Sequence, residues 1–178
     1  MSDRAFTLGW LHENSFDGFT SIEDIRSRRS AVAVQPGVYV VYRERLSRIQ
    51  FMERSQGGWF KGRDPSVPVE KLEKKWIDDA HVLYIGKADA GSAGKRGIKV
   101  RIHEYMRFGQ GEPIGHWGGR YLWQLDGTDQ LFVCWKPCAH PSDEETRLLD
   151  LFRGEYGALP FANLKGGSRS TRVRVEDR

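Results

Sequence analysis

The fold is decided by two runs of β-branched and aromatic residues, Gly37-Val38-Tyr39-Val40-Val41-Tyr42 and His81-Val82-Leu83-Tyr84-Ile85-Gly86. Residues of these types favour strands, and a glycine at the start of one run and the end of the other is typical of a strand boundary. Residues 120–125 and 131–135 have a similar composition on either side of an Asp126-Gly127 turn signal. The sequence therefore predicts a sheet built from these segments.

Two long helices are predicted from the spacing of apolar residues. The first covers residues 97–107 and ends at Gly109, because apolar side chains recur at helical spacing at Ile98, Ile102, Tyr105 and Met106. The second begins at Ser142, where Glu145 three residues later completes a capping box, and its apolar face carries Leu148, Leu149, Phe152 and Tyr156.

Shorter elements complete the predicted order. One helix begins after Ser21, whose hydroxyl can cap it, and another covers residues 69–76. Residues 48–54 suggest a further strand or a hairpin arm with its turn at Gly57-Gly58. Strands and helices mixed in this order indicate an α+β or an α/β fold.

Length and composition bound the class of protein. The chain has 178 residues, a length typical of one compact domain, and its 39% hydrophobic content is that of a globular protein. No run approaches 18 apolar residues and the N-terminus lacks the apolar core of a secretion signal, so we expect no membrane contact. Two cysteines cannot frame a disulfide scaffold, so we expect a cytoplasmic location.

Positive charge is concentrated in two segments. The overall net charge is only +4, but residues 86–107 carry six cations against two anions, and residues 164–178 carry five against two. A basic helix entered through a glycine-rich loop suits a phosphate-bearing partner, because Lys and Arg neutralise phosphates and helix N-termini offer free N–H groups. A solvated helix face accounts for the same charges, so charge alone leaves both explanations open.

Five polar elements follow one another along the chain. The first two are the tripeptides Gly37-Val38-Tyr39 and Tyr84-Ile85-Gly86, one on each predicted strand. The third is Arg101, which begins the pattern Arg101-Ile102-His103-Glu104-Tyr105 on the predicted helix. The last two are Glu145 near the start of the final helix and Asn163 in Pro160-Phe161-Ala162-Asn163. In this order they resemble the GIY-YIG nuclease superfamily.

The resemblance covers residues 36–163 and implies an α+β domain in which helices flank a small, mainly antiparallel central sheet. Tyr39 and Tyr84 are 45 residues apart, whereas the family joins its motifs by a short hairpin, so residues from about 45 to 80 are expected to be an insertion. Residues 1–35 are then an N-terminal extension, and residues 164–178 are a flexible basic tail.

The resemblance also implies roles for side chains in hydrolysing a phosphodiester. Glu145 would bind Mg²⁺ or Mn²⁺ as a hard oxygen ligand, with Glu144 as a competitor for this role, and Arg101 would hold phosphate oxygens through its planar fork. Tyr39 is the candidate that orients or deprotonates the water. The remaining catalytic candidates would position the phosphate, share the proton network or order the loop beside the metal: Tyr84, Tyr105 and Asn163.

Further residues are candidates for contact with nucleic acid. Five lie in the basic loop and helix, namely Lys87, Lys95, Arg96, Lys99 and His103. The others are His116 and Trp117 in the glycine-rich segment 109–119, where an exposed His and Trp suit close approach to a strand and stacking on a base. A tight turn with Trp117 buried is the alternative for that segment.

Two other stretches of the sequence partly match known site patterns, a zinc site and a phosphate-binding loop. Cys134, Cys138 and His140 have the residue types of a zinc site, but Cys134 falls inside an apolar strand and a fourth ligand is missing nearby, so two reduced thiols are the preferred interpretation. Residues 91–96 resemble a phosphate-binding P-loop only faintly, because Arg96 replaces the required Ser or Thr.

These observations predict a metal-dependent endonuclease that hydrolyses DNA, with RNA left open as a substrate. Two other classes compete, a non-catalytic nucleic-acid-binding module that keeps the fold and a basic protein-interaction domain. One site of this kind cuts one strand, so cleavage of both strands would need a homodimer or successive events.

Overall fold

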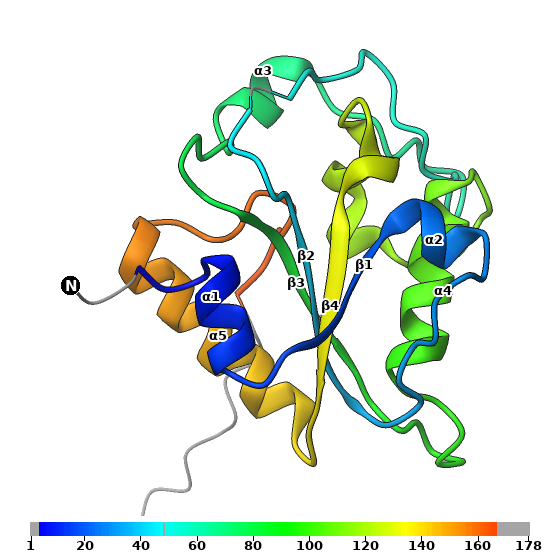
Figure 1. Ribbon diagram of the computed structural model, residues 1–178. Coiled ribbons are helices and arrows are strands. Elements are labelled where there is room, and N and C mark those ends of the chain that lie inside the picture. The colour runs from blue at the N-terminus through cyan, green and yellow to red at the C-terminus, as the bar shows by residue number, and fades with distance from the viewer. Residues whose placement is uncertain (1–3, 48, 167–178) are drawn as a thin grey trace, which may run out of the picture.

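The centre of the protein is a four-stranded sheet, seen in a computed structural model that describes residues 4–47 and 49–166 (Figure 1). The strands lie in the order β1-β4-β2-β3, and each neighbouring pair is antiparallel. Their bounds are Asp17–Ser21 for β1, Gly37–Tyr42 for β2, Val82–Ala88 for β3 and Phe132–Pro137 for β4. The prediction of an α+β fold around a small antiparallel sheet is therefore confirmed.

Helices cover both faces of this sheet (Figure 1). On one face lie α4, Ile98–Gly109, and the short α2, Ile22–Arg26. On the other face lie α5, Pro141–Tyr156, and α1, Leu8–Glu13. The connections hold one more α-helix and two 3₁₀ helices: α3 (Val69–Glu73), η1 (Trp117–Gln124) and η2 (Thr128–Gln130).

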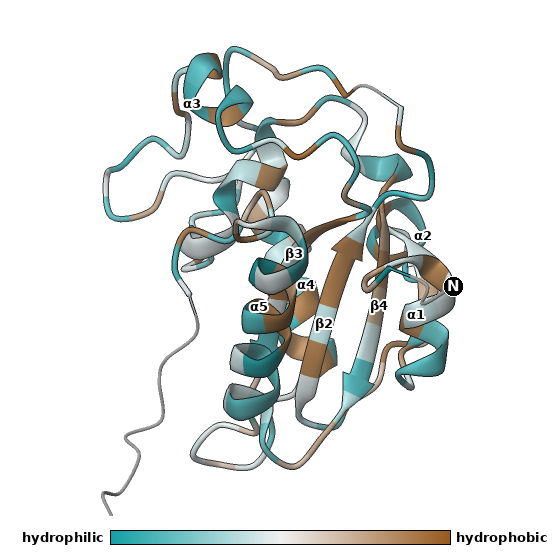
Figure 2. Ribbon diagram, turned by 90° about the vertical axis from the view of Figure 1, so that its left-hand side faces the viewer, coloured by the Kyte–Doolittle hydropathy of each residue, from teal (hydrophilic) through white to brown (hydrophobic). Residues whose placement is uncertain are grey.

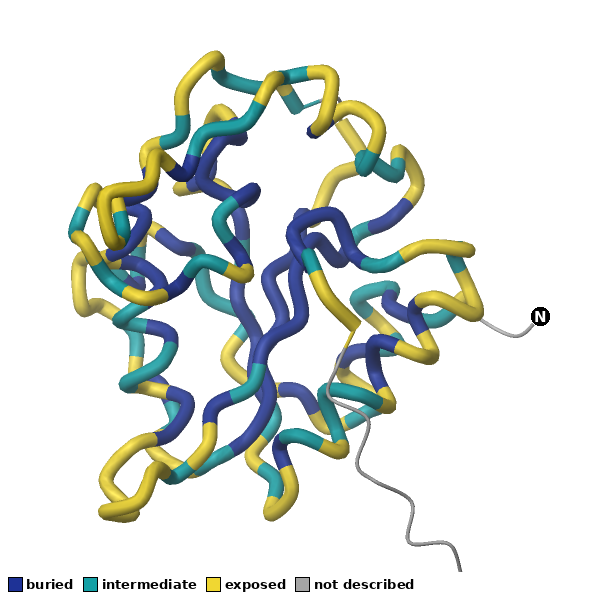
Figure 3. Tube along the Cα trace, turned by 180° about the vertical axis from the view of Figure 1, so that it is seen from behind, coloured by how far each residue is buried: buried dark blue, intermediate teal, exposed yellow. Residues whose placement is uncertain are grey.

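The central strand β2 separates two apolar cores. All six of its residues are buried, and the sheet forms the dark-blue centre of Figure 3. Tyr39 and Val41 pack toward α2 and α4, whereas Val38, Val40 and Tyr42 pack toward α1 and α5. Figure 2 shows the apolar colouring of the strands, with the amphipathic α5 alongside them. The alternation of strand side chains thus places Tyr39 on the α4 side of the sheet.

The segment expected as an N-terminal extension is part of the sheet. Within residues 4–35, β1 pairs with β4 through contacts such as Thr20 with Val133, so β1 forms one edge of the sheet. The helix predicted after Ser21 is present, and the Ser21 hydroxyl accepts a hydrogen bond from the Asp24 backbone N–H at 3.0 Å. The sequence pattern did not predict β1, because apolar and polar side chains do not alternate clearly over its five residues.

Two predicted strands are wrong. Residues 120–125 lie mainly in the 3₁₀ helix η1, and residues 48–54 contribute only an isolated bridge between Phe51 and Leu125 in the described part of the chain. The buried Gln124 explains this packing, because its side-chain amide donates to the Met52 and Val67 carbonyl oxygens at 2.9 and 2.7 Å. The insertion from 45 to 80 is therefore held against η1 by side-chain hydrogen bonds and by isolated backbone ones, such as that from the Met52 N–H to the Gln124 carbonyl oxygen at 2.9 Å, and not by a strand ladder.

Several element boundaries also differ from the prediction, and α3 ends at Glu73 where a helix to residue 76 was expected. Helix α5 begins at Pro141 after His140 and has no side-chain cap, so the capping box expected at Ser142 is wrong. Ser142 instead accepts a hydrogen bond from Lys87 Nζ at 2.7 Å. Helix α4 includes Gly109, and β3 continues to Ala88, so Lys87 lies on a strand and not in a loop. Of the predicted basic tail, only residues 164–166 fall within the described residues.

Candidate active site

Tyr39 on β2 and Tyr84 on β3 lie side by side because the two strands are antiparallel neighbours. Tyr39 pairs with Gly86, Val41 pairs with Tyr84, and the two ring centroids are 6.0 Å apart. Gly86 makes this possible, because a Cβ there would lie 2.5 Å from Cζ of Tyr39 and 2.8 Å from Cε1 of Tyr84. The glycine of the second tripeptide therefore provides the space that the Tyr39 phenol fills.

Tyr105 on α4 and His116 before η1 complete an aromatic cluster. The His116 imidazole stacks on the Tyr105 ring with a centroid distance of 4.0 Å, and Tyr105 lies 6.4 Å from Tyr39 and 5.2 Å from Tyr84. The Tyr105 hydroxyl donates to the Gly119 carbonyl oxygen at 2.6 Å. These contacts bring the two tyrosines of the strands, the helix α4 and the segment before η1 to one place.

The Tyr39 hydroxyl is the centre of a buried chain of polar groups. It lies 3.1 Å from Nε2 of His116, and the centroids of the Tyr39 and Tyr84 rings are 6.0 Å apart. Nδ1 of His116 is buried and has no hydrogen-bond partner among the described residues. Because an orphaned N–H is rarer in proteins than an orphaned acceptor, the proton is favoured on Nε2. The chain then runs from the His116 donor to Tyr39, with Tyr84 beside it.

Burial sets the protonation of this chain. It raises the pKa of Tyr84 to about 12, while the charge of Arg101 lowers it. Burial and then the neighbouring Tyr84 raise the pKa of Tyr39 well above its ordinary value. The interaction between the two phenols lowers the pKa of Tyr84 and raises that of Tyr39, so Tyr84 is the more easily ionised. Burial and Arg101 lower the pKa of His116, which is neutral at pH 7.

Arg101 on α4 is a cation held beside the two tyrosines. Its Nη1 donates to Glu104 at 3.3 Å, and the same carboxylate accepts two hydrogen bonds from Arg96 at 2.6 and 2.7 Å. Burial lowers the pKa of Arg101, but the nearby tyrosines and Glu104 outweigh this and raise it. Arg101 is therefore positively charged, and it shares the Glu104 carboxylate with Arg96.

The two glutamates at the start of α5 have different surroundings. Glu144 accepts hydrogen bonds from Arg147 at 2.8 Å and from Lys136 at 3.1 Å, and these cations lower its pKa to about 2. Glu145 has no hydrogen bond or ion pair among the described residues, and burial raises its pKa, opposed by Lys87 and Arg101. The charged Glu144 carboxylate is thus already paired with two cations, whereas the Glu145 carboxylate is free to bind a ligand.

An open cleft of about 670 Å³ contains Tyr84, Lys87 and Glu145 on its walls. A smaller hollow of about 250 Å³ on the other side of Lys87 is lined by Arg101 and Arg96. Tyr39 lines neither space and is only 1% exposed, since it lies behind Tyr84. The geometry therefore favours Tyr84 over Tyr39 as the tyrosine that meets a water molecule or a substrate.

Asn163 has a structural task in this site. Its Oδ1 accepts from the Ile85 backbone N–H at 2.9 Å, and its Nδ2 donates to the Ile85 carbonyl oxygen at 2.8 Å. Ile85 follows Tyr84 on the outer edge of β3, which no strand of the described residues covers. The Asn163 side chain therefore supplies the hydrogen bonds that a neighbouring strand would make there. Asn163 also lines the cleft, but both ends of its amide bind the β3 backbone.

The residues predicted to contact nucleic acid differ in how far they are exposed. Lys95, Arg96 and Lys99 are exposed, Lys87 is half-buried, and His103 is half-buried with a pKa that burial lowers. His116 does not fit the prediction, because it is 1% exposed and turned inward against Tyr105. Trp117 is half-buried and lines the cleft. The glycine-rich segment thus places its histidine in the core and its tryptophan at the cleft.

Sequence reasoning missed Arg120, which stands on the wall of the same cleft. Its guanidinium lies over the rings of Trp117 and Tyr121, at 4.5 and 5.1 Å from their centroids. Arg120 begins the segment 120–125, which the sequence predicts as a strand. The interleaving of arginine with aromatic residues in Trp117-Gly118-Gly119-Arg120-Tyr121 is the signal that could have found it.

The donor set fits a magnesium or manganese ion held by one carboxylate. Such ions often take only one or two protein carboxylates and complete their octahedron with water and phosphate oxygens. Glu145 meets this need as an unpaired, half-buried carboxylate at an open cleft. Among the described residues, no three His, Cys, Asp or Glu side chains cluster as a metal site, so Cys134, Cys138 and His140 form no zinc site there.

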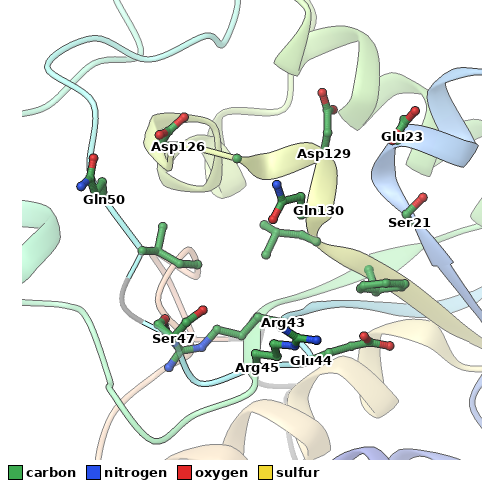
Figure 4. Close-up of a pocket in the computed structure, with 14 residues that line it drawn as sticks. Ser21, Glu23, Arg43, Glu44, Arg45, Ser47, Gln50, Asp126, Asp129 and Gln130 are labelled. Atoms are coloured by element: carbon green, nitrogen blue, oxygen red, sulfur yellow. Dashed lines mark hydrogen bonds between the residues drawn. The ribbon is translucent and has the colours of Figure 1, made fainter.

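A separate cleft of about 750 Å³ lies where Arg43 follows β2 (Figure 4). Its walls carry both signs of charge, including Arg45, Asp126 and Asp129. The buried Arg43 guanidinium is occupied by carbonyl oxygens, such as that of Ala80 at 3.0 Å. None of the predicted site residues lines this cleft.

No protein-family model, no curated protein and no solved structure matches this chain. Within the described ranges, no helix is long and apolar enough to cross a membrane. The chemistry of the site therefore has to be judged from its own geometry.

Proposed function

We propose that the chain is a metal-dependent endonuclease of GIY-YIG type that hydrolyses phosphodiester bonds in DNA. One observation supports this above the others: tyrosines from β2 and β3, an arginine from α4 and an unpaired glutamate from α5 converge on one site. Tyr84, Arg101 and Glu145 lie close enough to influence one another's ionisation. Phosphodiester hydrolysis needs an activated water, a cation for the phosphate and a metal ligand, and these residues are suited to the three tasks.

Tyr84 acts on the attacking water in this proposal. It faces the cleft, and its phenolate would accept a proton from water positioned between it and the phosphate. Tyr39 lies beside Tyr84 and lowers its pKa, which favours the phenolate, while His116 orients Tyr39. This arrangement exchanges the roles that the sequence suggested for the two tyrosines.

The cations bind the phosphate and its growing negative charge. Arg101 presents a planar fork that suits two phosphate oxygens, and the smaller hollow between Arg101 and Lys87 is where one of these oxygens would lie. Glu145 would hold Mg²⁺ or Mn²⁺, which supplies Lewis acidity and lowers the pKa of water when bound. Asn163 keeps β3, and with it Tyr84, in place.

A plasmid-nicking assay with Mg²⁺ tests the proposal. We expect the parent protein to convert supercoiled plasmid to the nicked form, and E145Q to lose at least 100-fold in rate while retaining its fold. E144Q is the matched control, because it removes the neighbouring carboxylate that is already paired. Undiminished nicking by E145Q, or none by the parent, contradicts the catalytic assignment. DNA binding without nicking would instead indicate a non-catalytic module.

A further inference from the structure

The cleft extends beyond the residues that the proposed reaction uses. Past Tyr84 and Glu145 its wall continues through Trp117, Gly118 and Arg120 to Leu164 and Lys165. The Arg120 Nη1 donates to the Trp117 carbonyl oxygen at 3.2 Å, and the guanidinium lies over the rings of Trp117 and Tyr121. Arg120 is thus held in one orientation at the cleft wall.

Arg120 differs from Arg101 and Lys87 in lacking an anionic partner. Arg101 contacts Glu104, and Lys87 contacts Ser142 and Asp89, but no carboxylate in the described ranges pairs with Arg120. Its Nε is buried and has no hydrogen-bond partner there, and burial lowers its pKa. Keeping an arginine in this state costs free energy, which an anionic ligand in the cleft would offset.

The remaining wall favours a nucleotide as that ligand. The indole of Trp117 offers a flat apolar surface, and aromatic stacking of this kind accepts any base. Gly118 beside it is exposed, and a Cβ there would meet nothing within 4 Å. Lys165 adds a second cation with no ion pair in the described part of the chain.

We propose that Arg120 and Trp117 bind the nucleotide next to the scissile one, the guanidinium on its phosphate and the indole against its base. The subsite rests on the proposed function, because it places a second phosphate of the same strand beside Tyr84 and Glu145. A planar guanidinium holds two phosphate oxygens at once, which a lysine at this position does not. The cleft would therefore bind at least two successive nucleotides without reading their sequence.

The test measures binding of a fluorescein-labelled DNA duplex by anisotropy, with Ca²⁺ in place of Mg²⁺ to separate binding from cleavage. R120A is expected to weaken binding about tenfold and to reduce the slope of log K against log salt by about one phosphate contact. W117A is expected to weaken binding about tenfold with an unchanged slope. R120K should keep the slope and lose part of the affinity. Circular dichroism confirms that each variant is folded.

R45A is the matched control, because Arg45 is an exposed arginine that lines the separate cleft. Its affinity should stay within about twofold of the parent value. A second arm replaces the phosphate beside the mapped cleavage position by a neutral methylphosphonate, which should weaken the parent but not R120A. The subsite is overturned if R120A and R45A bind DNA with equal affinity, or if the methylphosphonate weakens binding by R120A as much as it weakens binding by the parent. In that case, nicking by the parent still upholds the proposed function. A parent protein that neither binds nor nicks DNA overturns both.

Discussion

The Tyr39 hydroxyl lies 3.1 Å from Nε2 of His116, a residue 77 positions farther along the chain. Both groups are buried, and the second nitrogen of the imidazole has no partner in the described part of the chain. A buried polar pair of this kind is stable only when its hydrogen bonds are made, so the contact orients both side chains. Tyr39 is thereby fixed as the link between His116 and Tyr84.

Removing His116 should disturb the orientation of Tyr39 and lower the cleavage rate. In H116A, Tyr39 loses its donor and Tyr105 loses the ring stacked on it, so we expect the single-turnover cleavage rate to fall about tenfold and the protein to lose about 2–4 kcal/mol of stability. H116Q, which keeps a donor, should recover part of the rate. An unchanged rate in folded H116A would show that the contact does not orient Tyr39 for catalysis.

The two strand tyrosines should differ in importance. Tyr84 faces the cleft and Tyr39 lies behind it, so Y84F is expected to lose about 100-fold or more in single-turnover rate and Y39F about tenfold. DNA affinity measured in Ca²⁺ should change little in either variant. A larger loss in Y39F than in Y84F would restore Tyr39 as the residue that acts on the water.

The cleavage rate should rise with pH. The pKa of Tyr84 is raised to about 12, so its phenol is protonated at neutral pH and the ionised fraction grows tenfold with each pH unit below that value. Single-turnover rates measured from pH 6 to pH 9 should therefore increase with a slope near one. The slope should disappear in Y84F, whose residual rate has no phenol to ionise. A slope retained in Y84F would assign the titration to another group.

Glu144 should affect stability and not chemistry. Its pKa is lowered to about 2 by Arg147 and Lys136, so the ionised form stabilises the native state. That stabilisation is present above the unfolded pKa of about 4.3 and is lost as pH falls through about 2. E144Q should therefore unfold with about 1–2 kcal/mol less free energy at pH 7 and approach the parent at low pH. A pH-independent difference in thermal unfolding would contradict this.

Asn163 should be needed for folding. N163A leaves both the N–H and the carbonyl oxygen of Ile85 without their side-chain partners in a buried place, at an expected cost of about 2–4 kcal/mol in urea unfolding. N14A is the control, because it removes one hydrogen bond at the end of α1 and should cost about 1 kcal/mol. If N163A is as stable as N14A but inactive, the asparagine acts in the chemistry itself.

Local sequence patterns were sufficient for the elements that carry the motifs. The strands containing Tyr39 and Tyr84 lie where composition predicted them, and the helix containing Arg101 lies where helical spacing predicted it. The strand predicted at 120–125 failed because its apolar and aromatic residues suit a buried 3₁₀ helix equally well, and the buried Gln124 binds the insertion from there. Composition distinguishes such segments poorly when tertiary hydrogen bonds decide between them.

The order and residue types of Tyr39, Tyr84, Arg101, Glu145 and Asn163 are determined by the sequence alone, as is the alternation that turns Tyr39 toward α4. Only the tertiary structure decided that His116 turns inward to Tyr39, that Glu145 and not Glu144 is left unpaired, and that Arg120 reaches the cleft. The physical reason is that strand and helix patterns act over a few residues. Burial, charge pairing and access to the cleft depend on contacts between segments far apart in the chain.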